Sequence, residues 1–301
     1  MTKRRVDGVL LLDKPVGMTS NTALQKAKRL YQAAKAGHTG TLDPFASGLL
    51  PICLGEATKF SQTMLDADKV YRATVRLGVR TATGDPEGTV LETRPVRVDE
   101  ADVRRVLPRF TGEFLQTPPM HSALKVAGRP LYDYARQGVE IERKPRPVVV
   151  RRLELLDFRG DVFTLRVESG KGLYVRTLAE DLGEALGCGA HLLALVRLAV
   201  GPLRLEQAIG LKELEAMDMQ KRDDRLLPVD TLLMDLPRLV LDPESAWQLG
   251  HGQPIWRAGL KVGERMRAYG PDGRFIGLVE VDTDGRLAPK RLTALDLGAG
   301  A

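Results

Sequence analysis

A fifteen-residue segment from Gly37 to Pro51 constrains the fold of this chain most strongly. It reads GHTGTLDPFASGLLP, so three glycines and two prolines surround His38 and Asp43, and apolar residues continue to Leu54. Because glycine and proline interrupt regular structure, the segment predicts a loop. Loops on a rigid scaffold often present reactive groups, which makes Asp43 the candidate acid or nucleophile and His38 its neighbour. The alternative is structural, since an aspartate before Pro44 is common at turns and helix starts.

Length and charge narrow the class of protein. The 301 residues suffice for one large domain and a small one, and the net charge is +6. Residues 235–301 hold nine basic and nine acidic side chains, so the whole excess lies in the first 234 residues. This distribution favours a polyanionic partner of the larger part of the chain. No apolar run has the length of a membrane span and no secretory signal is evident, so we expect a cytoplasmic protein that binds no membrane.

The cysteines and the missing nucleotide motifs limit the chemistry. Cys53 and Cys188 are too few and too far apart for a disulfide framework, which favours a reducing compartment. Cys188 and His191 have a Cys-x-x-His spacing that could serve a metal, but no second pair stands nearby. We therefore expect both to be packing residues at a helix start, and we expect no metal. Neither a P-loop nor a dinucleotide fingerprint is present, so no cofactor is implied.

Hydrophobic periodicity predicts strands and helices in one mixed arrangement. Strands are expected at 9–13, 70–77, 148–158, 162–168 and 275–281, with Gly160-Asp161 as the turn of a hairpin. Helices are expected at about 19–34, 56–65, 99–110 and from Gly172 through Leu186, the third capped by Asp99. Long strands interleaved with helices indicate an α+β fold on a mixed or antiparallel sheet.

Further segments match, in order, the motifs of a known enzyme family. Together with Gly37–Pro51, they cover about residues 6–235 and closely resemble the TruB family of tRNA pseudouridine synthases. The matching segments are DKPVGMTS at 13–20, KVYRA at 69–73 with TATGD at 81–85, TPPM at 117–120 with Ser122, Ala123 and Lys125, GLYVRTL at 172–178, GCGAHL at 187–192 and LVRL at 195–198. Two departures are Leu173, where many members have Thr or Phe, and Val196, where many have a second arginine.

The resemblance assigns roles that the residues alone leave open. It implies that Asp43 is the catalytic carboxylate, that Arg176 is the cation beside it, and that Tyr71 stacks on the base and takes part in the chemistry. Pattern alone would make Arg176 a surface ion-pair residue and Tyr71 a core residue. The resemblance also implies substrate contacts for His38, Tyr174 and Leu195, of which the last two would otherwise be interpreted as helix core. Lys14 is expected to be structural or to order a loop.

The chemistry implied by the resemblance is the isomerisation of uridine to pseudouridine at position 55 in the tRNA T loop. The base must be detached at N1, rotated and rejoined through C5, which requires an ionised carboxylate in a dry pocket and a flipped-out nucleotide. Burial raises the pKa of a carboxyl group and an adjacent cation lowers it. The resemblance implies a catalytic domain at 1–236 and a PUA-like RNA-binding domain at 237–301. Nothing in the sequence demands more than a monomer, so we expect a monomer without an obligate protein partner.

Two other functions compete with this interpretation. One is a guide-RNA-dependent relative in the same superfamily, which would need partner proteins and often carries basic tails, whereas this sequence ends in LGAGA. The other is a non-catalytic protein that binds or folds RNA. The combined presence of Asp43, Tyr71 and Arg176 favours catalysis over binding alone.

Overall fold

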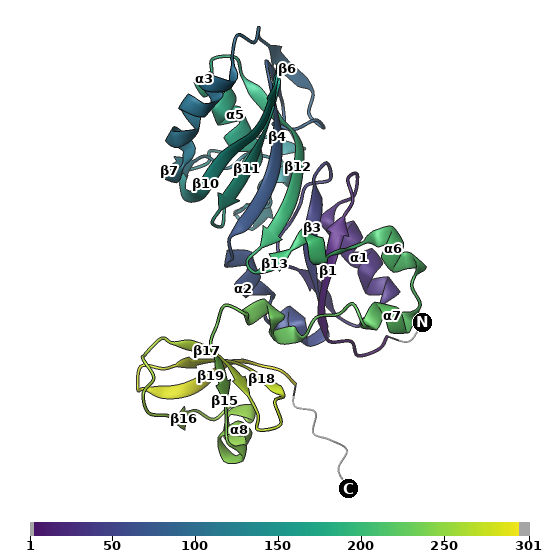
Figure 1. The fold of residues 1–301 in the computed structure, drawn as a ribbon, viewed down its shortest axis with the longest axis vertical. Coiled ribbons are helices and arrows are strands. Elements are labelled where there is room, and N and C mark those ends of the chain that lie inside the picture. The colour runs from purple at the N-terminus through teal and green to yellow at the C-terminus, as the bar shows by residue number, and fades with distance from the viewer. Residues whose placement is uncertain (1–2, 295–301) are drawn as a thin grey trace.

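The computed structural model describes residues 3–294, and its strands gather mainly in two sheets (Figure 1). The large sheet has ten strands, ordered β14-β1-β3-β12-β4-β11-β10-β7 with β13 beside β12 and β2 beside β3. The bounds in this order are Ile209–Gly210, Gly8–Lys14, Ser47–Leu54, Ala190–Val200, Lys69–Leu77, Val162–Ser169, Arg146–Arg159 and Gly112–Gln116, with Leu203–Arg204 for β13 and Ala36–His38 for β2. Because β14 with β1 and β12 with β3 pair in parallel and the other neighbours are antiparallel, the sheet is mixed. The fold is α+β, as the sequence predicts.

Helices and short ribbons surround this sheet. The α-helices before residue 237 are α1 (Ser20–Leu30), α2 (Ser61–Asp66), α3 (Glu100–Val106), α4 (Leu131–Ala135), α5 (Val175–Ala185), α6 (Leu211–Ala216) and α7 (Met219–Asp223). Four 3-10 turns are η1 (Gly55–Lys59), η2 (Leu107–Phe110), η3 (Leu205–Gln207) and η4 (Val229–Leu233). Two small ribbons pair β5 (Val79–Thr81) with β6 (Val90–Thr93) and β8 (Lys125–Val126) with β9 (Arg129–Pro130).

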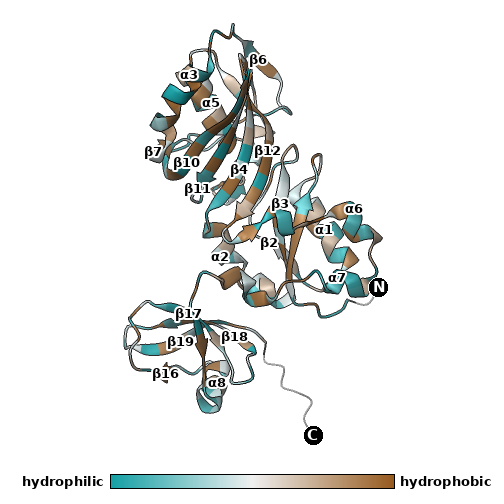
Figure 2. Cartoon of the chain, in the orientation of Figure 1, coloured by the Kyte–Doolittle hydropathy of each residue, from teal (hydrophilic) through white to brown (hydrophobic). Residues whose placement is uncertain are grey.

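Alternating side chains decide which face of the sheet is buried. Along β4, Ala73, Val75 and Leu77 are buried, and along β11 Phe163, Leu165 and Val167 are buried beside them. Figure 2 shows this alternation of hydrophobic and hydrophilic residues along the long strands. The buried face packs against α5 and α3 in one cluster. A second cluster joins β1 and β3 to α1.

Most predicted elements are present, with shifted ends. The hairpin β10–β11 turns at Gly160, which has φ +63°, and Asp99 caps α3 through a hydrogen bond from Asp102 N. The helix expected at 19–34 ends at Leu30, and the one expected at 56–65 is split into η1 and α2. The apolar stretch 190–200, which was not recognised as a strand, is β12 at the centre of the sheet.

Five strands form the second sheet, which lies beyond Pro237. Their order is β15 (Arg238–Val240), β17 (Arg265–Tyr269), β18 (Phe275–Val281), β19 (Arg286–Leu292) and β16 (Ile255–Trp256), with α8 (Pro243–Gly250) against them. The strand predicted at 275–281 is β18. The expected PUA-like region also includes 295–301, which lie outside the described residues.

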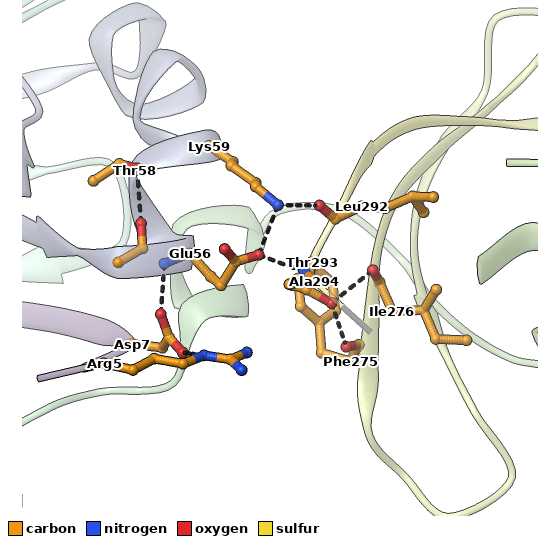
Figure 3. A network of polar contacts seen from close by, with 11 residues as sticks. Arg5, Asp7, Glu56, Thr58, Lys59, Phe275, Ile276, Leu292, Thr293 and Ala294 are labelled. Carbon is orange, nitrogen blue, oxygen red and sulfur yellow. Dashed lines mark hydrogen bonds and ion pairs between the residues drawn. The ribbon is translucent and has the colours of Figure 1, made fainter. Parts of the chain in front are cut away.

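Side chains of η1 tie the second sheet to the first (Figure 3). Lys59 Nζ donates to the Leu292 carbonyl at 3.0 Å and to Glu56 at 2.8 Å, and the Ala294 N–H donates to the same carboxylate at 2.5 Å. Phe60 packs against Phe275 with ring centroids 5.5 Å apart. The contact between the two sheets therefore combines apolar packing with charged hydrogen bonds.

Within residues 3–294, none of the helices combines the length and the apolar character needed to cross a membrane.

Candidate active site

Asp43 lies in the connection between β2 and β3, and the N-terminal motif holds this loop in place. The Ser20 hydroxyl donates to the Leu42 carbonyl at 2.9 Å and accepts from the Leu42 N–H at 2.7 Å. The Gly17 N–H donates to the Pro44 carbonyl at 2.8 Å. Leu42 and Pro44, on either side of Asp43, are thus held by Ser20 at the start of α1 and by Gly17 before it.

Arg176 faces Asp43 from the first turn of α5. Its Nε is 3.0 Å from Asp43 Oδ2, and its side chain is only 6% exposed, against 37% for Asp43. The surface ion pair that pattern alone favours for Arg176 is therefore wrong. The structure shows a buried guanidinium that reaches a carboxylate whose outer side remains open to solvent.

Three further contacts fix the orientation of this guanidinium. Nη1 donates to the Thr83 carbonyl at 3.0 Å and lies 3.3 Å from Asp85 Oδ2, while Nη2 donates to the His121 carbonyl at 2.6 Å. Asp85 is itself buried and accepts from the Glu87 N–H at 3.0 Å. Each guanidinium nitrogen of Arg176 thus has a partner, and Nε is the one closest to Asp43.

Burial raises the pKa of Asp43 above its usual range. The Arg176 charge and, less strongly, Lys14 lower that pKa, whereas the Asp85 charge raises it. The net direction is upward, so the cation moderates the effect of burial without reversing it. Lys14 is fully buried and donates to the carbonyls of Pro15 at 2.9 Å and Met18 at 2.6 Å, while burial lowers its pKa to about 8.

Tyr71 and Leu195 lie on adjacent strands of the central sheet. Leu195 of β12 pairs in register with Ala73 of β4, two residues beyond Tyr71. Both side chains belong to the apolar cluster that also takes in Phe45 from the Asp43 loop. Leu195 is therefore a buried strand residue, and its interpretation as helix core is wrong. The structure does bring Tyr71, Leu195 and the Asp43 loop to one part of the core.

Tyr174 and His38 flank this part of the molecule. Tyr174 precedes α5, where its N–H donates to Gln116 Oε1 at 2.9 Å and its carbonyl accepts from Gln116 Nε2 at 3.2 Å. These two hydrogen bonds with Gln116 orient the first turn of α5, which carries Arg176. His38 ends β2 and accepts from the Gly40 N–H through Nδ1 at 3.3 Å. Burial, together with the charge of Arg197, lowers the pKa of His38.

Cys188 and His191 pack in and beside the sheet. Cys188 is buried, and His191 lies on β12, where its Nδ1 is 2.9 Å from the Val79 carbonyl. They do not start a helix, since β12 begins at Ala190, so that part of the prediction is wrong. Nowhere in residues 3–294 do three or more His, Cys, Asp or Glu side chains gather as a metal site would require.

The sequence arguments missed three side chains that organise the site. Asp85 and Gln116 orient Arg176 and Tyr174, and Arg197 is a buried cation on β12. Asp85 stands in the TATGD motif and Arg197 in LVRL, so the motifs themselves were the available signal. Gln116 had none, because a single buried glutamine at the end of a largely exposed strand shows no pattern.

Comparison with known proteins decides the family. The family model described as TruB family pseudouridylate synthase (N terminal domain) matches residues 28–175. Two C-terminal models of the same family match 176–234 and 237–293. The tRNA pseudouridine synthase B of Burkholderia mallei (strain NCTC 10247) is 57% identical, covering 97% of this chain and 98% of the relative. This chain belongs to the TruB family. A second relative of the same name, from Dechloromonas aromatica (strain RCB), is 56% identical over 97% of each chain.

Solved structures extend the TruB likeness to the whole fold. The chain matches one in the crystal structure of a Cbf5-Nop10-Gar1 complex with a TM-score of 0.71 and 28% identity, covering 91% of this chain and 78% of the other. It also matches one in an archaeal box H/ACA Nop10-Cbf5 complex with a TM-score of 0.71 and 25% identity, covering 96% and 86%. The α+β architecture is thus that of the pseudouridine synthases.

Proposed function

We propose that this protein isomerises uridine to pseudouridine at position 55 in the T loop of tRNA, with Asp43 as the catalytic carboxylate. The ion pair between Arg176 Nε and Asp43 Oδ2 at 3.0 Å carries the proposal. It places a carboxylate of defined orientation at the edge of a buried, otherwise apolar cluster. The near-complete overlap with relatives named tRNA pseudouridine synthase B supports tRNA as the substrate.

The other named residues take roles around that carboxylate. Tyr71 stacks on the flipped base and assists proton removal at C5, while Tyr174, Leu195 and His38 line the uracil pocket. Flipping costs a few kcal/mol, less in a loop whose bases are already splayed. Residues 1–236 form the catalytic domain and 237–301 an RNA-binding domain, and the monomer acts in the cytoplasm without a cofactor or protein partner.

Incubation of the purified protein with an unmodified tRNA transcript, followed by pseudouridine mapping, tests this function. We expect one pseudouridine, at position 55, and none in a transcript that carries cytidine there. No product from any tRNA would overturn the proposal.

A guide-RNA-dependent reaction is the second candidate, favoured by the similarity to Cbf5 chains solved with Nop10. It predicts that tRNA alone remains unmodified and that a guide RNA with partner proteins restores the reaction. A protein that only binds or folds RNA would form no pseudouridine, and its RNA binding would persist when Asp43 is replaced.

A further inference from the structure

Arg197 has one of the largest fully buried side chains in the described residues, at 1% exposure. A guanidinium remains charged in proteins, and a buried charge is costly unless hydrogen bonds satisfy it. Here each of the three guanidinium nitrogens donates to a backbone carbonyl: Nε to Leu49 at 2.7 Å, Nη1 to Thr41 at 3.3 Å and Nη2 to Gly40 at 3.1 Å. All three hydrogen bonds therefore go to one segment of backbone, residues 40–49.

That segment contains the Asp43 loop between β2 and β3, and Arg197 binds backbone on both sides of Asp43. Gly40 and Thr41 precede Asp43, and Leu49 follows it. The backbone of Arg197 also touches the loop, because it pairs in register with Gly48 at the start of β3. A Cβ added at Gly48 would lie 2.4 Å from the Arg197 carbonyl oxygen, so only glycine fits there. Arg197 thus contacts the backbone both before and after Asp43.

The same arginine also reaches the strand that carries the stacking tyrosine. Arg197 of β12 and Tyr71 of β4 are register partners, so their side chains project from the same face of the sheet. Tyr71 lies close enough to Arg197 to oppose part of the lowering of the Arg197 pKa that burial causes. One buried group therefore connects the Asp43 loop to Tyr71.

We propose that Arg197 is a positioning residue that fixes the distance between the Asp43 carboxylate and Tyr71, without contacting the substrate itself. A displacement of about 1 Å at a reacting group costs on the order of 10²-fold in rate. Three hydrogen bonds in a planar fork define a loop position more tightly than a single ammonium can. This role rests on the proposed isomerisation and goes beyond it by assigning a function to a residue that the family motifs leave unassigned.

The charge of Arg197 provides a readout that does not depend on turnover. Burial lowers the pKa of His38, and the positive charge of Arg197 lowers it further. His38 Nδ1 accepts from the Gly40 N–H while the Gly40 carbonyl accepts from Arg197. A change that moves the guanidinium therefore alters both the loop and the titration of His38.

The decisive experiment compares Arg197→Lys with Arg222→Lys. Arg222 is the control, since it also donates to three carbonyls, none of which belongs to the Asp43 loop: those of Leu214, Leu30 and Glu215. We expect both variants to unfold at lower denaturant concentration than the wild type. Only Arg197→Lys should lower the single-turnover rate with saturating tRNA, by about 10²-fold, with tRNA Kd changed less than about threefold because phosphate contacts dominate affinity.

Further measurements separate positioning from folding. We expect NMR titration to give a different pKa for His38 in Arg197→Lys than in the wild type, and the same pKa in Arg222→Lys. The proposal would be overturned by a folded Arg197→Lys enzyme whose single-turnover rate is within about threefold of the wild-type rate. If that variant does not fold, Arg197→Gln replaces it. A wild-type His38 pKa at or above the ordinary value would also contradict the proposal, because it would show that the Arg197 charge does not act on the loop as described. If the wild type modifies no tRNA, the proposed function fails, whereas the His38 titration still reports on the loop.

Discussion

The Nε atom of Arg176, and not the forked end of its guanidinium, makes the closest approach to Asp43, at 3.0 Å. The forked end is engaged with Asp85 and with the carbonyls of Thr83 and His121. Two other segments, around 83–85 and 121, therefore hold Arg176 in the position from which it contacts Asp43. Both segments lie far from Asp43 along the chain, within or beside other motifs, and they share the role of orienting Arg176.

Replacing Asp43 with asparagine should eliminate turnover while tRNA affinity changes little. The amide preserves shape but provides neither a negative charge nor a nucleophile, and affinity comes mainly from phosphate contacts. Single-turnover assays and filter binding measure the two effects separately. Asp161→Asn is the control, because Asp161 is a half-exposed partner of Arg76 on the surface. A variant at position 43 that retains more than a small fraction of the rate would show that another group performs the chemistry.

Arg176→Lys should lose on the order of 10²-fold in single-turnover rate, although the charge is conserved. An ammonium is a compact point charge, so it cannot satisfy Asp43, Asp85 and two carbonyls from one position. Binding of tRNA should remain within a few-fold of the wild type. The control is Arg265→Lys, in an exposed ion pair with Glu280 in the second sheet. Near-normal chemistry in Arg176→Lys would mean that Asp43 is oriented by other contacts.

The acid limb of the pH–rate profile should reflect the raised pKa of Asp43. In the proposed reaction only the ionised carboxylate is active, so the single-turnover rate should fall as pH decreases through a pKa above the roughly 3.9 of a free aspartate. Because the Asp85 charge raises the pKa of Asp43, Asp85→Asn should move this limb to lower pH, whatever its effect on the maximal rate. Circular dichroism at each pH verifies that the protein remains folded. A limb that shifts to higher pH would contradict the assignment.

Gln116→Leu should destabilise the protein by about 1–3 kcal/mol and also slow the reaction. The substitution leaves the Tyr174 N–H without its acceptor, two residues before Arg176. It also removes one of two donors to the Tyr174 carbonyl, which still accepts from the Leu178 N–H. Chemical denaturation measures the first effect and single-turnover kinetics the second. Gln207→Leu, at an exposed position, serves as the comparison. Loss of stability without any change in rate would show that α5 tolerates movement of its first turn.

Local patterns predicted those parts of the fold whose neighbours in space are also neighbours in sequence. The β10–β11 hairpin is an example, since alternation and a glycine turn suffice. β12 was missed because Ala190–Val200 is rich in Leu and Ala, which favour helices, and a buried central strand lacks alternation.

In the site, too, local features could be predicted from the sequence and long-range contacts could not. Asp43 and Arg176 could be named from motif resemblance, but their contact joins residues on different elements. Asp85 lies 91 positions from Arg176 along the chain, and Gln116 lies 58 positions from Tyr174. No local signal reveals such pairs, because tertiary packing alone brings them together.

Glu56 provides a test of how the two sheets are joined. Its carboxylate accepts from Lys59 Nζ and from the Ala294 N–H, and the net effect is a lowered pKa despite partial burial. A glutamine keeps an acceptor for the N–H but loses the charge. Since the groups are partly exposed, we expect a loss of about 0.5–1 kcal/mol in the second sheet. Trp247 and Trp256, the only tryptophans, both lie in that region, so their fluorescence follows its unfolding.

The pH dependence of this loss has a defined sign. A carboxyl group whose pKa is lower in the folded state contributes stability above its unfolded pKa, about 4.3, and loses it as pH falls through the folded value. The stability difference between the wild type and Glu56→Gln should therefore be full at pH 7 and shrink progressively below about pH 4. Glu244→Gln, at an exposed position of α8, is the control for removing a carboxylate that does not join the two sheets. A difference that persists unchanged in acid would mean that Glu56 acts through packing and that its charge does not join the sheets.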